Sequence, residues 1–310
     1  MGRYIAARVG QAIFVILGIS LASFLLIHLV PGDPARLLAG PRASEQAVQA
    51  LRDQLGLSDS LPSQYVSFMS GLATGDLGTS IAQRRPVSEV VGPRVLPSVY
   101  LIAFSLAIAI LLAVPLAVLA ARRHDRVADE VVRGVSTITF VMPTFWLGLL
   151  LVLLFSIRFH VLPSSGYGDG FVGHLKALTL PALAVGAYIA PVLMRTLRSS
   201  LLESFGSDYI SAARARGLSE RRVVYRHALR NSTISTVTLL GVFVGGLLSA
   251  TVVAENVFAI PGLGSLLVSS VNARDFQTVQ AIAVLFGVAV VLVNLGTDLL
   301  YLVLDPRIRL

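Results

Sequence analysis

The residue types that carry most protein chemistry are few in this chain and are not spaced for catalysis. The sequence has no cysteine, which excludes disulfides, thiolate sites and cysteine-bound iron–sulfur clusters. None of its five histidines stands at metal-ligand spacing from another histidine or from a carboxylate, and no convincing Ser–His–Asp order or GxSxG motif is present. The histidines are His28, His124, His160, His174 and His227. The sequence therefore predicts no catalytic site, no metal site and no cofactor in this chain.

Lys176, the single lysine, bears on nucleotide binding. A P-loop needs a lysine that reaches the phosphates from a GxxxxGK[ST] frame, and Lys176 lies in GHLKAL, which lacks that frame. We therefore expect that any energy from ATP enters through another subunit.

Candidate catalytic, metal-binding and nucleotide-binding residues are few because most of the chain is apolar. Its 310 residues are 55% hydrophobic and 14% charged, whereas soluble domains average about 25% charged residues. The apolar residues come in uninterrupted runs of about 20, the length of a helix that crosses the bilayer, which disfavours a soluble protein with a large core. A span must be helical because its backbone groups need internal partners. The predicted spans are residues 11–30, 98–121, 134–157, 178–198, 233–254 and 278–303.

Prolines fall inside several of these runs, where neighbouring helices can satisfy the freed carbonyls and a kink is common. They are Pro115, Pro143, Pro181 and Pro191. The first apolar run follows two arginines, as the apolar core of a signal peptide does. It is too long for a typical signal-peptide core, and no cleavage site follows it. We expect it to remain as a helix.

The arginines predict the orientation. The net charge is +8, and in membrane proteins cations concentrate in cytoplasmic loops. With both termini in the cytoplasm, the inner segments hold Arg3, Arg8, Arg122, Arg123, Arg126, Arg133, Arg195, Arg198, Arg214, Arg216, Arg221, Arg222, Arg226, Arg230, Arg307 and Arg309. The short outer loops hold Arg158, Lys176 and Arg274. The remaining cations lie in a long outer segment, which translocates largely regardless of charge.

Three parts follow from this topology. Residues 1–30 form the cytoplasmic N-terminus and the first span, residues 31–97 an extracytoplasmic cap segment, and residues 98–310 a membrane core. Within the cap, periodic apolar residues predict an amphipathic helix over Ser44–Leu57, with a stop at Gly56. Gln64–Leu72 is expected to form a second short helix.

The cytoplasmic stretch 203–232 resembles two short helices around Gly217. Ser207 or Asp208 can cap the first helix and Ser219 the second, while a glycine suits the left-handed residue that ends a helix. A helix laid in a groove of another protein would use Tyr209 and Ile210 as anchors, and the small Ala212 and Ala213 would permit close approach. The alternatives are an ordinary basic loop or one lying on anionic lipid. A DNA-binding helix-turn-helix is disfavoured because spans tether both sides, so no nucleic-acid partner is expected.

Polar residues in or beside the spans are the other candidates. Glu255, at the outer end of the fifth span, is a candidate for a gate or a receptor contact, although a carboxylate at the interface can also reach water. Asp298, one turn after Asn294, could line the conduction path, belong to a proton relay, or pair with an arginine. Gly241, Gly245 and Gly246 predict close helix packing, either within the chain or with a sister subunit.

The order of motifs along the chain resembles the importer-type ABC permeases. Ser211–Ala212–Ala213, followed after three residues by Gly217, is similar to their EAA loop, and Asp208–Asn231 resembles the peptide/nickel branch over its whole length. Ser211 replaces the usual Glu and Arg230 the frequent Pro, and both departures are common in that branch. The other matching segments are Pro31–Pro34, Leu55–Leu57, Gln64–Tyr65, Gly75–Gly78, Pro86–Val87, Met142–Leu151, Val253, Glu255, Phe258, Pro261–Gly264 and Arg274–Asp275.

This resemblance implies an all-α polytopic fold of the type I (MetI-like) kind and a role as the first, B-type, permease subunit of a dipeptide or oligopeptide importer. By resemblance, the ATPase-coupling residues are Tyr209, Ile210, Ser211, Ala212, Ala213, Arg216, Gly217 and Leu218. The candidates for an outer gate or receptor contact are Glu255, Phe258, Pro261, Gly262 and Gly264. The residues that could line the pore or form ion pairs are Asp298 and Asn294.

The implied partners are a homologous second permease, two cytoplasmic ATPases that use ATP and Mg, an extracytoplasmic substrate-binding protein, a peptide substrate and membrane lipid. The expected location is the bacterial cytoplasmic membrane. Nickel, glutathione or another small solute is an alternative substrate. A secondary transporter or channel is the alternative class, but it predicts polar residues near the midplane of several spans, and few are present.

Overall fold

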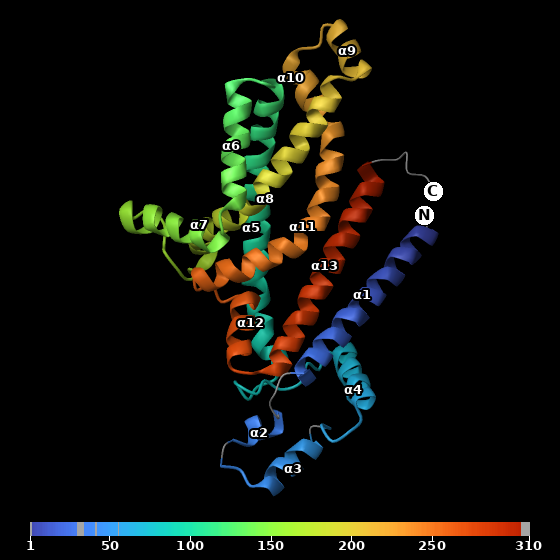
Figure 1. Ribbon diagram of the computed structural model, residues 1–310, viewed down its shortest axis with the longest axis vertical. Coiled ribbons are helices and arrows are strands. Elements are labelled where there is room, and N and C mark those ends of the chain that lie inside the picture. Colours follow the sequence, from blue (N-terminus) through green and yellow to red (C-terminus); the bar gives the residue numbers. More distant parts are fainter. Residues whose placement is uncertain (1, 30–33, 41, 55, 305–310) are drawn as a thin grey trace. The chain divides into compact units, whose positions relative to one another are not determined.

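A computed structural model describes residues 2–29, 34–40, 42–54 and 56–304 (Figure 1). Pro31–Asp33 of the predicted PGDP motif, Leu55, Arg307 and Arg309 lie outside these residues. The described chain is helical apart from its turns, loops and one isolated bridge between Thr79 and Pro86, which confirms the all-α prediction. The chain divides into two compact units. Unit 1 holds residues 1–97 and 262–292, and unit 2 holds residues 98–261 and 293–310.

Unit 1 contains the long outer segment and the helices that flank it. Its helices are α1 (Gly2–Leu29), α2 (Pro34–Ala39), α3 (Glu45–Gln54), α4 (Leu61–Thr74), α12 (Leu263–Asn272), the start of α5 (Val87–Arg122) and the first part of α13 (Phe276–Leu304). The helices α3 and α4 confirm the two that the sequence predicted in this segment.

Aromatic and apolar contacts hold unit 1 together. Tyr65 of α4 hydrogen-bonds Ser20 of α1 at 2.9 Å between hydroxyl oxygens, and its ring meets that of Phe24 edge to face. Gly287 lets α13 approach α1, since a Cβ there would lie 2.7 Å from Ile19 Cδ1. A second apolar cluster joins the start of α5, α12 and α13, and its buried members are Val87, Val90, Val91, Leu263, Leu266, Ala281 and Ile282.

Unit 2 is built around α8, the most buried of its long helices. Its elements are the rest of α5, α6 (Val127–Val141), α7 (Thr144–Leu151), the π-helix η1 (Val152–Arg158), α8 (Gly170–Phe205), α9 (Asp208–Ala215), α10 (Glu220–Arg222), the π-helix η2 (Val223–Ala228), α11 (Leu229–Val257) and the end of α13. The helix α8 packs most extensively on α11 and also contacts α6 and α7. Burial of most of its middle part agrees with the apolar residues there.

The helices account for the predicted spans with one change. In the part of the chain that the structure describes, four helical segments are long and apolar enough to cross a membrane: Arg8–Leu25 of α1, α5, α8 and Phe276–Asp298 of α13. The helix α11 covers the fifth predicted span. The third predicted span, 134–157, corresponds to α6 and the α7–η1 segment, which meet at an angle of 105° beside Pro143, one of the prolines expected to kink the spans.

The helix break between α6 and α7 falls at a proline, Pro143. Proline alone does not explain the break, because other helices continue through their prolines. Pro143 caps α7, and Met142 before it is extended with ψ 126°, the conformation that a following proline favours. Pro181 and Pro191 instead lie inside α8, and α5 continues through Pro115. Pro181 and Pro191 are buried, and the packing of α8 against its neighbours holds them in helical geometry.

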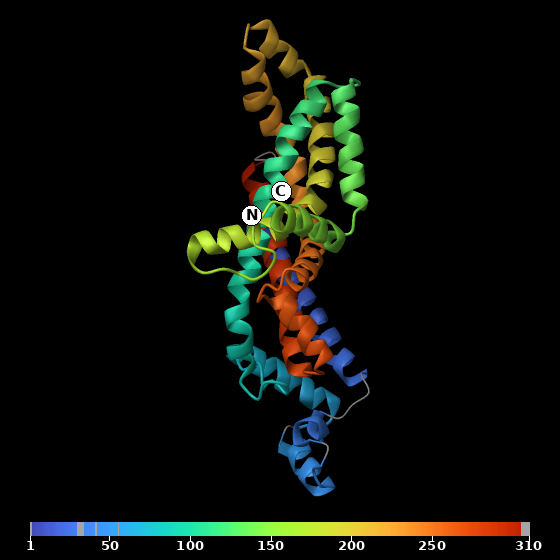
Figure 2. The ribbon, with the colours of Figure 1, turned by 90° about the vertical axis from the view of Figure 1, so that its left-hand side faces the viewer.

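The basic loops of unit 2 lie at one end of that unit. Figure 2 shows the turn between α5 and α6 at the same end as α9 and α10, with α7 away from it. The turn carries Arg122, Arg123 and Arg126, and the α9–α10 region carries Arg214, Arg216, Arg221 and Arg222. This arrangement agrees with the prediction that both segments face one compartment.

Candidate functional site

The segment between α8 and α11, residues 206–228, forms the predicted pair of helices and is called the coupling segment below. Ser207 is the N-cap of α9 and Ser219 that of α10, both with extended backbone. Gly217 adopts φ +76°, the left-handed conformation that costs other residues about 1–2 kcal/mol. The left-handed Gly217 and the two cap positions are as predicted, but neither serine makes a side-chain cap hydrogen bond, and Ser207 Oγ instead donates to the Ser204 carbonyl.

The coupling segment has one face inside this chain and one face outside it. Ile210 is fully buried and Ala213 nearly so, and both belong to the main apolar cluster of unit 2 together with Val223 and Val224. Leu218 packs against the same cluster. The exposed predicted residues are Tyr209, Ser211, Ala212, Arg216 and Gly217. Ile210 and Ala213 therefore fix the segment to its own subunit, and the exposed residues are left for a partner.

Polar contacts further restrain the coupling segment. Arg214 Nε lies 2.7 Å from Glu220 Oε1, which joins the two short helices across Gly217. Ser204 and Ser232 bond at 3.0 Å and join the end of α8 to α11. Burial alone would raise the pKa of the Tyr209 hydroxyl, but side-chain hydrogen bonds with Ser204, Asn231 and Ser207 outweigh it and lower that pKa. The segment is thus tied to both helices that it connects.

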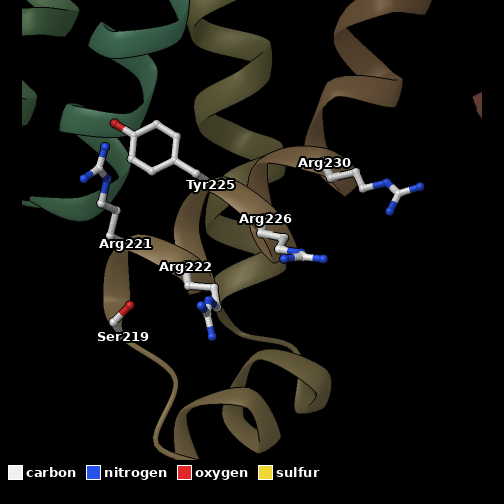
Figure 3. Close-up of a pocket in the computed structure, with 6 residues that line it drawn as sticks. All are labelled: Ser219, Arg221, Arg222, Tyr225, Arg226 and Arg230. Atoms are coloured by element: carbon white, nitrogen blue, oxygen red, sulfur yellow. The ribbon is translucent and has the colours of Figure 1, made fainter.

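A basic hollow of about 610 Å³ opens on the second helix of the coupling segment. It is lined by Ser219, Arg221, Arg222, Tyr225, Arg226 and Arg230 (Figure 3). Val223, Val224 and Ala228 occupy the opposite, buried side of the same helix. The sequence analysis counted these arginines for orientation but did not recognise that they share one face.

A buried ion pair fixes α6 to α8 near the start of the coupling segment. Asp129 is fully buried, and its carboxylate accepts from Arg198 Nε at 2.7 Å and from Arg198 Nη2 at 2.5 Å. The backbone N–H of Asp125 donates to it at 3.2 Å, and Arg133 Nε lies 3.8 Å away. Sequence analysis missed this pair, because its members are 69 residues apart and no local pattern links them.

The structure also places His124 beside Asp125 and Asp129, with candidate ligand atoms within 4.8 Å of one another. The sequence analysis found no such grouping. The two Asp129 oxygens already accept from Arg198, and His124 lies 2.9 Å from Asp125. The donor set is therefore consumed by an ion-pair network, and it does not fit a resident metal.

The predicted outer-gate residues of unit 2 are mostly buried. Glu255 is fully buried, and its carboxylate accepts a hydrogen bond from Ser98 Oγ at 2.5 Å. It therefore does not reach water within this chain, which was the alternative that the sequence left open. Phe258 is also buried; its carbonyl accepts from Gly166 N–H at 2.8 Å. A Cβ at Gly148 would lie 3.0 Å from the Phe258 ring. These two residues hold the end of α11 to α5 and α7, while Pro261 is partly exposed.

The remaining predicted positions fall in different surroundings. In unit 1, Gly262 and Gly264 are buried at the start of α12, where Gly262 N–H donates to Ser265 Oγ at 3.2 Å. In unit 2, Asp298 is partly buried and Asn294 is exposed on α13.

The three glycines of α11 divide between two settings. A Cβ at Gly241 would lie 3.1 Å from the Thr297 side chain, and one at Gly246 would lie 3.1 Å from the Tyr188 hydroxyl. Gly245 has open space. Gly241 and Gly246 thus allow helices to pack closely inside the chain.

A buried cluster in unit 1, also unanticipated, centres on Asp275. Its carboxylate accepts from Ser80 Oγ, from Ile81 N–H at 3.0 Å and from Thr278 Oγ1 at 2.8 Å. Gln277 Oε1 adds a bond from Thr79 N–H at 2.8 Å. These bonds fix the loop before α5 to the start of α13.

The apolar spans indicate a membrane protein, and comparison with known families identifies its class. The chain belongs to the family described as "Binding-protein-dependent transport system inner membrane component", which matches residues 113–310. Residues 1–92 match the family that describes the N-terminal part of the membrane component of a binding-protein-dependent transport system. The protein is therefore the pore-forming membrane subunit of an ABC importer and not an enzyme. This family membership excludes the alternative class, a secondary transporter or channel.

Particular relatives narrow the branch to the peptide/nickel type. The chain is 40% identical over 309 residues to the glutathione transport system permease protein GsiC of Salmonella choleraesuis, covering 100% of this chain and 99% of the relative. It is 38% identical over 309 residues, with the same coverage, to GsiC of Escherichia coli K12.

Solved structures agree on the fold. An inward-facing MetNI methionine ABC transporter chain matches with a TM-score of 0.58 at 17% identity, over 70% of this chain and 96% of that one. A second chain, from an amino acid ABC transporter crystallised with histidines, matches with a TM-score of 0.50 at 15% identity, over 71% and 95%. The MetI-like fold is confirmed.

Proposed function

We propose that this chain imports short peptides, glutathione among them, as one of two membrane subunits of an ATP-driven transporter. The full-length similarity to permeases named for glutathione transport supports this substrate class. Glutathione is itself a small peptide, so the predicted peptide substrate and this alternative differ in size and charge and not in chemical class.

The proposed complex adds a homologous permease, two cytoplasmic ATPases that use ATP and Mg, and an extracytoplasmic binding protein. A separate ATPase is needed because the only lysine lies outside any P-loop frame. The proposed orientation has both termini in the cytoplasm of a bacterial cell. The three-part division at residues 30 and 97 is retained as a proposal for the assembled protein.

The observation that carries the proposed mechanism is the two-faced coupling segment. Its inner face, with Ile210 and Ala213, is buried in unit 2, and its outer face offers Tyr209, Ala212 and Arg216. A segment held this way transmits movement, because a push on the outer face displaces α8 and α11 without first deforming the loop. ATP-driven closure of the ATPases would then switch the spans between two rigid arrangements.

The proposed roles at the other positions follow from burial. Glu255 and Phe258 would position the outer end of α11 in each of the two arrangements, with Pro261, Gly262 and Gly264 as the turn beyond it. Asp298 and Asn294 are proposed to line the path or to take part in ion pairing.

Docking is tested by replacing an exposed small residue with a large one. Ala212→Arg should abolish copurification of the ATPases and ATP-dependent uptake, because the added side chain blocks close approach, while thermal stability stays unchanged. Ala213→Arg is a poorer test since Ala213 is buried. The matched control is Ala273→Arg, an exposed alanine of unit 1. Normal uptake by the Ala212→Arg transporter would refute docking through this face.

The substrate class is tested on the complete transporter in vesicles. Labelled glutathione and a labelled dipeptide are offered with the binding protein, and the ligand carried by the purified binding protein is identified. Uptake of either supports the proposal. Uptake of nickel, with neither peptide transported, would contradict it.

A further inference from the structure

The basic hollow on the coupling segment is a candidate ligand site distinct from the proposed ATPase contact. Its arginines lie on α10, η2 and the first turn of α11, whereas the predicted docking residues lie on α9 and at Gly217 and Leu218. Figure 3 shows the side chains of Arg222 and Arg226 projecting from successive turns on one side of the helix, with Arg230 beyond them. All four arginines are exposed.

The positive charge of this face is not compensated among the residues that the structure describes. Among the described residues, no carboxylate lies within ion-pair distance of Arg221, Arg222, Arg226 or Arg230, although other arginines are paired, as Arg214 is with Glu220. Like charges one turn apart on a helix repel each other. An anion bound between them would remove that repulsion.

The donors suit phosphate groups. A guanidinium presents a planar fork of N–H donors that matches phosphate oxygens in pairs, and the hydroxyls of Ser219 and Tyr225 add neutral donors to the same hollow. Arg221 and Arg230 are nine residue steps apart, which is about 14 Å at the helical rise of 1.5 Å per residue. That length exceeds a single phosphate group.

The position along the chain favours membrane lipid as the source of the phosphates. Arg230 lies in the first turn of α11, just before the apolar run predicted to enter the bilayer. Basic clusters directly beside a cytoplasmic span attract anionic lipid, and tyrosine is enriched at this depth because its ring is amphipathic. We infer that the hollow binds the phosphate head groups of anionic phospholipids at the cytoplasmic leaflet, an inference that rests on the proposed orientation.

The test compares two triple variants of the full chain, each losing three positive charges. One carries Arg222→Gln, Arg226→Gln and Arg230→Gln in the hollow. The control carries Arg122→Gln, Arg123→Gln and Arg126→Gln in the exposed turn between α5 and α6, at the same end of unit 2. Each protein is placed in phosphatidylcholine nanodiscs with or without phosphatidylglycerol, and retained phosphatidylglycerol is measured by native mass spectrometry after detergent extraction.

Each arginine near an anionic surface contributes about fivefold in affinity. The hollow variant should therefore lose phosphatidylglycerol affinity by about 100-fold if the contributions add, and the control by much less. Millimolar inorganic phosphate should not displace the lipid. Equal losses in both variants, or displacement by free phosphate, would overturn the inference.

Copurification of the ATPases separates this inference from the proposed function. The hollow variant should retain its ATPases in neutral lipid. Loss of the ATPases with unchanged lipid retention would assign the hollow to an acidic protein surface, which overturns the lipid site. The docking face is tested independently by Ala212→Arg.

Discussion

Two buried aspartates, one in each unit, are stabilised in opposite ways. Asp129 of unit 2 is fully buried and faces the guanidinium of Arg198, which is itself 14% exposed. Asp275 of unit 1 is 1% exposed, and its carboxylate accepts hydrogen bonds from two hydroxyls and one backbone N–H. One carboxylate is balanced by a charge, and the other is solvated by neutral donors.

The two aspartates differ in how much stability is lost when one of their partners is removed. A buried ion pair that loses one partner leaves an uncompensated charge in a low-dielectric site, which is severely destabilising. A carboxylate with several neutral donors loses them one at a time, at about 1 kcal/mol for each hydrogen bond. The Asp129 pair supports α8, which leads directly into the coupling segment, whereas the Asp275 cluster orders a loop. We therefore expect that removing one partner of Asp129 costs most of the stability that the pair provides, whereas the cost at Asp275 grows with each donor removed.

The largest effect is expected when Arg198 is replaced. Arg198→Met should lower the free energy of unfolding by about 3–5 kcal/mol, because Asp129 is left charged and buried. Thermal unfolding of the purified chain measures the loss. Arg133→Met is the matched control, since Arg133 is half exposed and 3.8 Å from the same carboxylate, and it should cost less than about 1 kcal/mol. Similar losses in both variants would show that Asp129 does not depend on Arg198.

A smaller effect is expected at Asp275. Asp275→Ala should cost about 2–3 kcal/mol, because the Ile81 N–H and the buried Ser80 hydroxyl lose their acceptor. Hydrogen exchange at the Ile81 amide should accelerate. Asp275→Asn keeps one carbonyl oxygen and should lie between the wild type and the alanine variant. If the two variants were equally unstable, the expected stepwise cost at Asp275 would be refuted.

The coupling segment supported by α8 should respond next. Gly217→Ala should cost about 1–2 kcal/mol through its left-handed backbone alone, since no atom lies within 4 Å of the added Cβ. ATP-dependent uptake should fall while substrate binding by the receptor is unchanged. Gly206→Ala is the control, because Gly206 has φ −81°. Equal uptake by both variants would show that the turn at Gly217 tolerates a side chain.

The smallest effect is expected at a single neutral donor. Ser80→Ala should cost about 1 kcal/mol, because Asp275 keeps its bonds from Ile81 and Thr278. The midpoint of thermal unfolding should shift slightly and uptake should persist. Ser70→Ala, which removes an exposed hydroxyl bonded only within α4, should have no measurable effect. A loss at Ser80 as large as that for Arg198→Met would remove the distinction between the two aspartates.

Local patterns in the sequence were enough to predict much of the structure. Apolar runs predicted the long helices, and periodicity predicted α3 in the outer segment. Ser207, Gly217 and Ser219 predicted the two short helices of the coupling segment, because caps and left-handed glycines act on their own backbone within a few residues.

What the sequence determined by itself is therefore most of the long helices, the coupling segment and, through its ordered motifs, the family. Tertiary structure decided which of these residues face a partner. Only packing buried Ile210 and Ala213, broke the chain at Pro143 but not at Pro181, and brought Arg198 to Asp129. The reason is physical: caps and periodicity depend on neighbours a few residues away, whereas burial and charge pairing depend on segments that meet only after the chain has folded.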